Sequence, residues 1–179
     1  MRFRGTFIVL ACLGMAACTA RAPQPTPAPP VARPTPTPVP TPTPIPTHAT
    51  WMDAPQTPGD WFYRSGGGTS RALFGDAGSD ARFALTCDPA QRSITLARAG
   101  TAAGPLQMNI RTETRDRALS AAPSANAIPS IDARVGATDA ILDAMAFSKG
   151  RFAVEVAGLD TLYLPSWPEV TRVIEDCRR

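Results

Sequence analysis

Few residues of this 179-residue chain have the chemistry that catalysis or metal binding requires. The only histidine is His48, and the only lysine is Lys149. A Ser-His-Asp or Cys-His site needs an imidazole beside its nucleophile, and a typical zinc site needs several Cys or His ligands. The glycines at 66–68 are followed by Thr69 and Ser70, without the lysine of a phosphate-binding loop. We therefore expect no catalytic residue, no metal and no cofactor.

Carboxylate pairs are the remaining candidates for chemistry. Asp76 and Asp80 flank Gly78 and could hold calcium together with loop carbonyls. The Asp-x-Asp-x-Asp-Gly loop is absent, so a solvated turn is the favoured interpretation. Asp139 and Asp143 lie four residues apart on an expected helix, where solvent exposure is the simpler interpretation. A hydrolase that uses carboxylates alone stays open as an alternative, because their separation in space is not known.

Residues 1–18 have the marks of an export signal. Residues 1–4 are basic, residues 6–17 form a short apolar run, and small residues precede Cys18. The run of about 12 residues is too short for a transmembrane helix, which needs about 20. The closing sequence LGMAAC, at residues 13–18, resembles the bacterial lipobox. An ordinary signal peptide that contains cysteines is the alternative.

The lipobox resemblance implies a lipid anchor. In that family the cysteine, here Cys18, is acylated and becomes the N-terminus of the mature protein once residues 1–17 are removed. Thr19 follows it, in place of the aspartate that retains enterobacterial lipoproteins in the inner membrane. By that analogy we expect an envelope location at the outer membrane, with the folded part in the periplasm. The anchor itself implies no activity.

A proline-rich tether follows, which we place at residues 18–48. Residues 22–47 contain twelve prolines. Because proline fixes φ and removes a backbone donor, we expect an extended polyproline II spacer here. At about 3.1 Å per residue, its 26 residues would span roughly 80 Å. A ligand for a proline-recognition domain and a glycosylated stalk are the alternatives.

The remaining residues, 49–179, have the size of one globular domain. Four of the eighteen basic residues and none of the fifteen acidic residues precede residue 49, so the formal net charge of this part is −1. Nucleic-acid binding needs a concentrated basic patch. We therefore expect no nucleic-acid partner.

Cys87 and Cys177 are the two cysteines of this domain, in a compartment that permits disulfides. We predict that they form a disulfide, which would stabilise the fold by roughly 4 to 5 kcal/mol on the chain-entropy model. Two free buried thiols or a redox pair are the alternatives. A redox pair usually has a close Cys-x-x-Cys spacing, which is absent here.

Short stretches of alternating apolar and polar residues predict a β-rich domain. Strands are expected at 61–64, 70–74, 82–87, 93–98, 106–110, 151–156 and 161–164, with weaker candidates at 115–120 and 128–135. The segments 82–87 and 93–98 form an expected hairpin with a four-residue loop. The predicted class is a β-rich α+β fold, built on an antiparallel β-sandwich or a partly open barrel.

Two helices are expected beside these strands. Thr138 could cap a short internal helix that ends at Met145. Ser166 and Glu169 match a capping box for a C-terminal amphipathic helix, in which Arg172 could pair with Glu169 or Asp176 on the outer face. The apolar stripe of that helix contains four residues: Val170, Val173, Ile174 and Cys177. The disulfide would therefore staple this helix to the inward face of the strand that carries Cys87.

Two surface features could bind a partner. The basic turn at 148–151, with Lys149 and Arg151, could contact lipid headgroups or glycan, although a polar β-turn is the simpler interpretation. Trp51 and Trp61, with the two aromatic residues after Trp61, could form an exposed patch, although packing against the core is the simpler interpretation.

The C-terminal part carries a resemblance to a group of proteins. The sequences GRFAVEV at 150–156, LYLP at 162–165 and WPE at 167–169, with EDCR at 175–178, resemble uncharacterised exported lipoproteins of alphaproteobacteria, particularly of the sphingomonad type. A small domain with a final helix locked by a cysteine also looks like the periplasmic β-sandwiches related to invasion-associated and type VI accessory proteins. These resemblances imply an architecture and transfer no functional residue.

Three functions follow from these features. The first is a non-enzymatic binding or scaffolding module, held on the membrane by its lipid anchor, with an envelope protein or peptidoglycan as partner. A sheet edge could accept a peptide strand in such a module. The second is an inhibitor of a lysozyme or protease, and the third is the carboxylate-only hydrolase. The oligomeric state does not follow from the sequence.

Overall fold

The computed structural model describes residues 50–124 and 127–179, all of which belong to one compact unit. The predicted signal, Cys18 and the tether lie outside the described residues. The elements in chain order are a 3-10 helix η1 (Trp51–Asp53), β1 (Asp60–Gly66), β2 (Thr69–Gly75), β3 (Phe83–Asp88), β4 (Ser93–Ala99), β5 (Leu106–Arg111), β6 (Asp116–Ser124), β7 (Ser130–Gly136), α1 (Ala140–Ala146), β8 (Arg151–Val156), β9 (Leu162–Pro165) and α2 (Pro168–Arg178).

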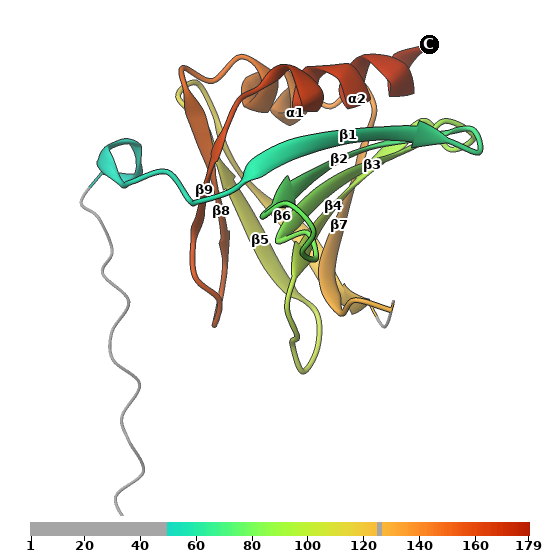
Figure 1. Ribbon diagram of the computed structural model, residues 1–179. Coiled ribbons are helices and arrows are strands. Elements are labelled where there is room, and N and C mark those ends of the chain that lie inside the picture. The colour runs from blue at the N-terminus through green and yellow to red at the C-terminus, as the bar shows by residue number, and fades with distance from the viewer. Residues whose placement is uncertain (1–49, 125–126) are drawn as a thin grey trace, which may run out of the picture. The chain divides into compact units, whose positions relative to one another are not determined.

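All nine strands belong to one antiparallel sheet, in the order β1-β2-β3-β4-β7-β6-β5-β8-β9 (Figure 1). Every predicted strand is present, including the two weaker candidates. The predicted hairpin is β3–β4, in which Asp88 pairs with Ser93 around a loop of residues 89–92. Gly67 and Gly68 both have positive φ, at 60° and 79°, and form the two-residue turn between β1 and β2. Glycine adopts this conformation without steric cost.

The sheet bends so that strands from both ends of the order share one interior. The ring of Trp61 on β1 lies 5.3 Å from that of Phe74 on β2 and 6.5 Å from that of Phe152 on β8, measured between centroids. Phe83 on β3 lies 6.4 Å from Phe152. The result is the expected sandwich-like β-rich fold, in which the sheet does not close into a barrel.

Both helices lie across one end of this folded sheet (Figure 1). The four residues of the predicted stripe on α2, Val170, Val173, Ile174 and Cys177, are all buried. Their burial follows from the i, i+3, i+4, i+7 spacing, which places them on one side of the helix. No helix within residues 50–124 and 127–179 has the length and apolar character that crossing a bilayer requires.

The predicted caps of the two helices are each wrong by one residue. Asp139 caps α1, because its carboxylate accepts a hydrogen bond from the Ile141 N–H at 3.0 Å, in the place expected for Thr138. Trp167 is the N-cap of α2 and makes no side-chain cap bond, with Pro168 at the first helical position. Ser166 therefore lies one residue too early to complete the predicted capping box with Glu169.

The predicted disulfide is confirmed. It joins Cys87 on β3 to Cys177 on α2, with 5.4 Å between the Cα atoms and a sequence separation of 90 residues. The predicted ion pairs of Arg172 with Glu169 and Asp176 are not observed. The Arg172 guanidinium instead lies 4.2 Å from the centroid of the Tyr63 ring, so that α2 contacts β1 as well as β3.

Candidate functional site

The edge of the sheet formed by β9 is covered. The Thr57 N–H donates to the Tyr163 carbonyl at 2.9 Å, and the Tyr163 N–H donates to the Thr57 hydroxyl at 2.8 Å. The indole N–H of Trp61 donates to the carbonyl of Pro165 at 2.8 Å. The segment that leads into β1 thus binds the main-chain groups with which β9 would otherwise pair.

The opposite edge, formed by β1, has no such cover from any described strand. The Arg82 N–H donates to the Phe74 carbonyl at 2.7 Å, so the main-chain groups of Phe74 face β3. Successive residues of a strand point their N–H and C=O groups to opposite sides. The main-chain groups of Leu73 and Arg71 therefore face β1.

The register of the β1–β2 pair then identifies the free groups of β1. Leu73 lies opposite Phe62, and Arg71 lies opposite Arg64, so Phe62 and Arg64 bond to β2. The N–H and C=O groups of the residues after each of them, Tyr63 and Ser65, point away from the sheet. One contact supports this assignment independently, because the Arg64 guanidinium donates to the Tyr63 carbonyl at 3.1 Å.

A pocket of about 480 Å³ lies beside β1 on the outer face of the sheet. Phe62, Arg64 and Leu73 line one part of it, and the loop at 76–81 lines another. Phe62 and Leu73 are half-buried, so the pocket has an apolar floor next to the free edge. Arg64 flanks this floor, with its guanidinium carbon 5.9 Å from the centroid of the Phe62 ring.

The loop that borders this outer pocket contains the predicted calcium ligands. Asp76 and Asp80 lie on a turn in which the Ser79 N–H donates to the Asp76 carbonyl at 3.1 Å. Residues 50–124 and 127–179 contain no group of three or more His, Cys, Asp or Glu side chains that could hold a metal ion. Residues of the loop line the outer pocket, and the hydrogen bond between Ser79 and Asp76 is that of a turn.

A second recess, of about 300 Å³, lies on the inner face between the β1–β2 hairpin and α2. Tyr63, Ser65 and Ser70 line its sheet side, and Asp176 lines its helix side. The Tyr63 hydroxyl donates to the Asp176 carboxylate at 2.6 Å. The two cavities thus lie on opposite faces of the same strand edge.

The predicted basic turn has structural contacts of its own. The Lys149 ammonium lies 3.1 Å from the Glu113 carboxylate, and its side chain is 86% exposed. The Arg151 guanidinium donates to the Ala54 carbonyl and thereby holds η1 against the start of β8. Surface ion pairs of this kind contribute little to stability. Lys149 and Arg151 lie outside both cavities beside β1.

The two tryptophans of the predicted aromatic patch are buried, at 6% exposed for Trp51 and 5% for Trp61. The structure therefore agrees with the interpretation that they pack against the core. Of the four aromatic residues, Phe62 and Tyr63 are the half-buried pair, and they are the two that border the cavities beside β1.

The carboxylates considered for catalysis are engaged in structural contacts. Asp139 caps α1 and pairs with Arg117 at 2.6 Å. Asp143 pairs with Arg178 of α2 at 2.8 Å and so connects the two helices. Each is held by a cation on a different element, Arg117 on β6 for Asp139 and Arg178 on α2 for Asp143.

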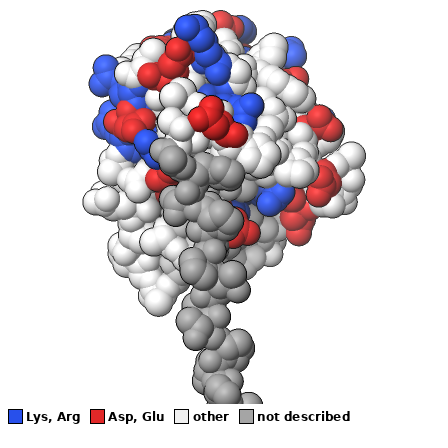
Figure 2. Space-filling model, turned by 90° about the vertical axis from the view of Figure 1, so that its left-hand side faces the viewer, with Lys and Arg blue, Asp and Glu red and all other residues white. Residues whose placement is uncertain are grey.

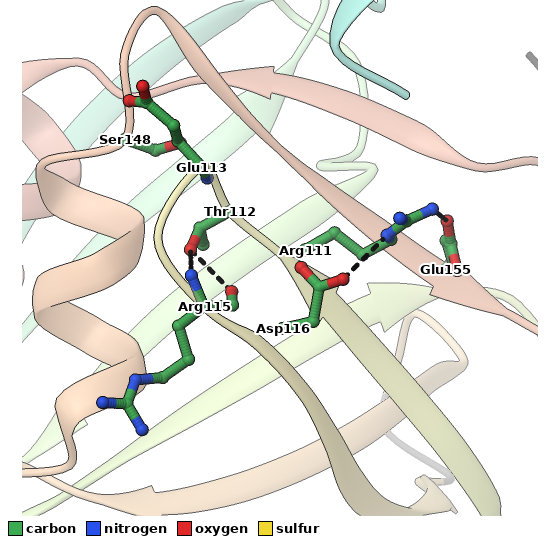
Figure 3. A network of polar contacts seen from close by, with 7 residues as sticks. All are labelled: Arg111, Thr112, Glu113, Arg115, Asp116, Ser148 and Glu155. Atoms are coloured by element: carbon green, nitrogen blue, oxygen red, sulfur yellow. Dashed lines mark hydrogen bonds and ion pairs between the residues drawn. The ribbon is translucent and has the colours of Figure 1, made fainter. Parts of the chain in front are cut away.

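A further polar network lies at the β5–β6 turn (Figure 3). Arg111 lies between two carboxylates, at 3.3 Å from that of Asp116 and 3.4 Å from that of Glu155. The Thr112 hydroxyl bonds to both main-chain groups of Arg115, at 2.6 and 3.0 Å. These contacts hold the turn in one conformation, which gives the network a structural role.

One arginine lies inside the fold. Arg98 is 8% exposed, and its guanidinium donates to the carbonyls of Ala99 and Asp160 at 2.6 and 3.2 Å. Burial lowers the pKa of Arg98, the nearby Arg82 lowers the pKa further, and Asp160 opposes the shift. Carbonyl contacts to Ala99 at the end of β4 and to Asp160, two residues before β9, explain why this side chain is tolerated inside.

Acidic and basic residues are interspersed on the face shown in Figure 2. That face does not carry the concentrated basic patch of a nucleic-acid interface.

No family model, no curated protein and no solved structure matches this chain. The candidate site therefore depends on geometry alone.

The free edge of β1 was missed by the sequence analysis as a specific site. Residues 61–64 were predicted to open the first strand, and β1 is present there. Which strand lies at an edge depends on the order of all the strands. Only the folded sheet shows that, among residues 50–124 and 127–179, a segment covers β9 and no strand covers β1.

Proposed function

We propose that this protein is an envelope-anchored lipoprotein whose folded part is a non-enzymatic binding module that takes up an extended peptide beside β1. The observation that carries this proposal is the difference between the two sheet edges. β9 is bonded by the segment around Thr57, whereas Tyr63 and Ser65 on β1 direct their main-chain groups away from the sheet. Strand addition to an exposed sheet edge is a general mode of peptide recognition.

The sequence of β1 is compatible with this role. Natural proteins commonly protect an exposed edge with proline, lysine or a bulge. β1 contains neither proline nor lysine, and its seven residues pair one-to-one with β2. Its basic residue, Arg64, donates to the outward carbonyl of Tyr63 at 3.1 Å, where a donor from an added strand would bind. Peptide binding would displace this guanidinium.

The energy of such a contact is modest. Tyr63 and Ser65 offer four main-chain groups, and each hydrogen bond contributes about 0.5 to 1.5 kcal/mol net. The main chain would then supply roughly 2 to 6 kcal/mol, whereas micromolar binding requires about 8. Side chains in the flanking cavities must supply the remainder, and we expect micromolar affinity and rapid exchange.

The anchor supports the envelope part of the proposal. Residues 13–18 resemble a lipobox, and Cys18 is followed by a proline-rich segment that separates it from the folded part. A tethered module of this kind would hold its binding edge near partners of the same envelope. The proposal assigns no catalytic role to any residue.

A proline substitution tests the edge directly. The bait is the mature chain from residue 18, with Cys18→Ser to keep it free of lipid, and the probe is a display library of random nine-residue peptides. Ser65→Pro removes one outward N–H but leaves the groups that pair with β2, so selected peptides should lose binding at least tenfold. Lys149→Ala, on the distant basic turn, serves as the matched surface control and should retain binding. Peptides that bind Ser65→Pro as well as the parent would overturn the proposal, as would the absence of any selected peptide.

Backbone methylation of a selected peptide provides a test that leaves the protein unchanged. In an added strand, alternate N–H groups point toward β1 and away from it. Methylation at one set of alternate positions should abolish binding, and methylation at the other set should be tolerated. Equal effects at both sets would contradict strand addition.

A further inference from the structure

The sequence of the edge strand β1 is symmetric about Phe62, with an acid on one side and a base on the other. The strand contains Asp60, Trp61, Phe62, Tyr63 and Arg64 in that order. Trp61 is buried on the inner face, and side chains alternate along a strand, so Asp60, Phe62 and Arg64 share the outer face. A strand that passes β1 in the opposite direction with the same sequence therefore presents an acid to each base.

The two charges of β1 have no partner of opposite charge in the folded chain. Asp60 and Arg64 are exposed, and neither belongs to an ion pair within residues 50–124 and 127–179. They do not reach each other, because four residues of extended strand separate their Cα atoms by about 13 Å. Arg64 instead lies opposite Arg71 on β2, and like charges at opposite positions repel each other. A carboxylate on the open side of Arg64 would offset this repulsion.

A second copy of β1 fits this edge in an antiparallel arrangement centred on Phe62. Phe62 then faces Phe62 of the second copy, and Asp60 of each copy faces Arg64 of the other. Because the main-chain groups of Phe62 bond to β2, this central pair is of the non-hydrogen-bonded type, in which side chains lie closest. Two copies related in this way form a contact with two-fold symmetry.

Main-chain groups on both sides of the centre complete the ladder. Trp61, like Tyr63, directs its N–H and C=O away from β2 by the alternation of the strand. Trp61 of each copy lies opposite Tyr63 of the other, so these pairs exchange both of their main-chain hydrogen bonds. On the inner face the same pairs place an indole beside a phenol ring, and aromatic cross-strand pairs are favourable.

The position of the Arg64 guanidinium supports this arrangement. It donates to the Tyr63 carbonyl at 3.1 Å, so its charge lies at the open edge of the sheet. In the paired state the Trp61 N–H of the second copy donates to this carbonyl and displaces the guanidinium. The Asp60 carboxylate of the second copy lies opposite Arg64 on the same face and accepts in its place.

We infer that β1 pairs with β1 of a second copy of this chain, antiparallel and centred on Phe62, and that Asp60 and Arg64 set the partner and the register. A shift of two residues would place Arg64 opposite Phe62 and lose both ion pairs. Self-pairing goes beyond the proposed function and does not require that any peptide bind.

The pairing is expected to be weak and reversible, because a contact confined to one strand is small. We expect a dissociation constant of about 100 µM. Below that concentration the monomer prevails and its edge is open to a peptide. Because both use the same main-chain groups, pairing and peptide binding exclude each other.

Charge reversal at either position tests the register. The sample is the mature Cys18→Ser chain, and sedimentation velocity measures its self-association. Asp60→Lys places two cations opposite each other in both halves of the contact, and Arg64→Glu places two anions there. Each variant alone should therefore associate at least tenfold more weakly than the parent. An equimolar mixture of the two variants should form a mixed dimer about as strongly as the parent, because every cation then faces an anion.

Arg134→Glu is the matched control. Arg134 on β7 is exposed and lies in the same cross-strand row as Arg64, through Arg71, Thr86 and Thr95, so it carries the same charge change away from the edge. This variant should pair as the parent does. Recovery of the dimer on mixing the two edge variants also shows that both are folded.

Self-pairing and peptide binding fail in different ways. A parent chain that stays monomeric at about 1 mM would overturn self-pairing, and peptide binding could still stand. A dimer that neither edge variant weakens, or a mixture that associates no better than the separate variants, would also overturn it. Recovery of the mixed dimer together with a selection that yields no peptide would reject peptide binding alone. A saturating selected peptide should dissociate the parent dimer, and persistence of the dimer would contradict pairing through β1.

Discussion

Removal of the disulfide is a perturbation whose magnitude follows from the fold. The bond closes a loop between two residues separated by 90 positions. The chain-entropy model gives about 4.6 kcal/mol at 25 °C for a loop of this length. For a domain of roughly 130 residues, that loss corresponds to a decrease in Tm of about 15 to 20 °C.

The comparison requires a double variant, Cys87→Ala with Cys177→Ala, because a single substitution would leave one reactive thiol. Parent and variant both carry Cys18→Ser. Urea unfolding followed by tryptophan fluorescence reports on the core through Trp61, which lies 5.3 Å from Phe74. We expect the midpoint to fall without a change in the native far-UV spectrum, since Val170 and Val173 still bury the helix.

The measured loss of stability shows how strongly the disulfide restricts the unfolded chain. A loss of about 3 to 5 kcal/mol agrees with a cross-link that restricts the unfolded chain. A loss below about 1 kcal/mol would refute the reasoning, because it would mean that the cross-link barely restricts the unfolded ensemble. The reduced parent protein should unfold at nearly the same midpoint as the double variant, which serves as the control.

Three further predictions concern substitutions of single residues. Asp139→Ala removes a helix cap and an ion pair, so the free energy of unfolding should fall by about 1 to 2 kcal/mol in urea, and an unchanged value would contradict the assigned cap. Gly100→Ala forces a side chain onto a residue with φ of 149° and should lower stability by about 1 to 3 kcal/mol, whereas Gly104→Ala, with open space around it, should have little effect. Equal effects of the two glycine variants would rule out backbone strain as the cause. Cys18→Ser should release the protein from membrane fractions and prevent acyl labelling, and continued membrane association would argue against the lipid anchor.

The strands and the disulfide were predictable because their signals are local. Phe83, Leu85 and Cys87 lie at every second position of one strand, and all three are buried in the sheet. Cys177 belongs to the buried stripe of α2, so both sulfur atoms point to the interior. Period-two and period-3.6 patterns each define one inward face, and two inward-facing cysteines were the best candidates for a bond.

The helix caps were harder to place, because neighbouring residues competed for the same role. Thr138 and Asp139 are both capping types, and the first turn of α1 selects Asp139. At α2 the proline at 168 sets the first helical position, which places Trp167 at the cap. An N-cap side chain must reach an N–H two or three residues ahead, so a shift of one residue removes the bond.

The candidate site depends on contacts that no local pattern contains. Tyr63 meets Asp176 across 113 positions of sequence, and Trp61 bonds to Pro165 across 104. The strand order places β1 and β9 at the two edges of the sheet, and the segment around Thr57 bonds to β9. Sequence patterns identify a strand and its inward face, but they do not identify which strand remains at the edge.

The central claim is that the main-chain groups of Tyr63 and Ser65 point away from the sheet and bond to an added strand. Amide hydrogen exchange measured by NMR on the mature Cys18→Ser chain tests this claim most directly. In the free protein, the amides of Tyr63 and Ser65 should exchange rapidly, while those of Phe62 and Arg64 should be protected by β2. Saturation with a selected peptide should slow exchange at Tyr63 and Ser65 at least tenfold. Protection of these two amides in the free protein, or no change on binding, would contradict the account.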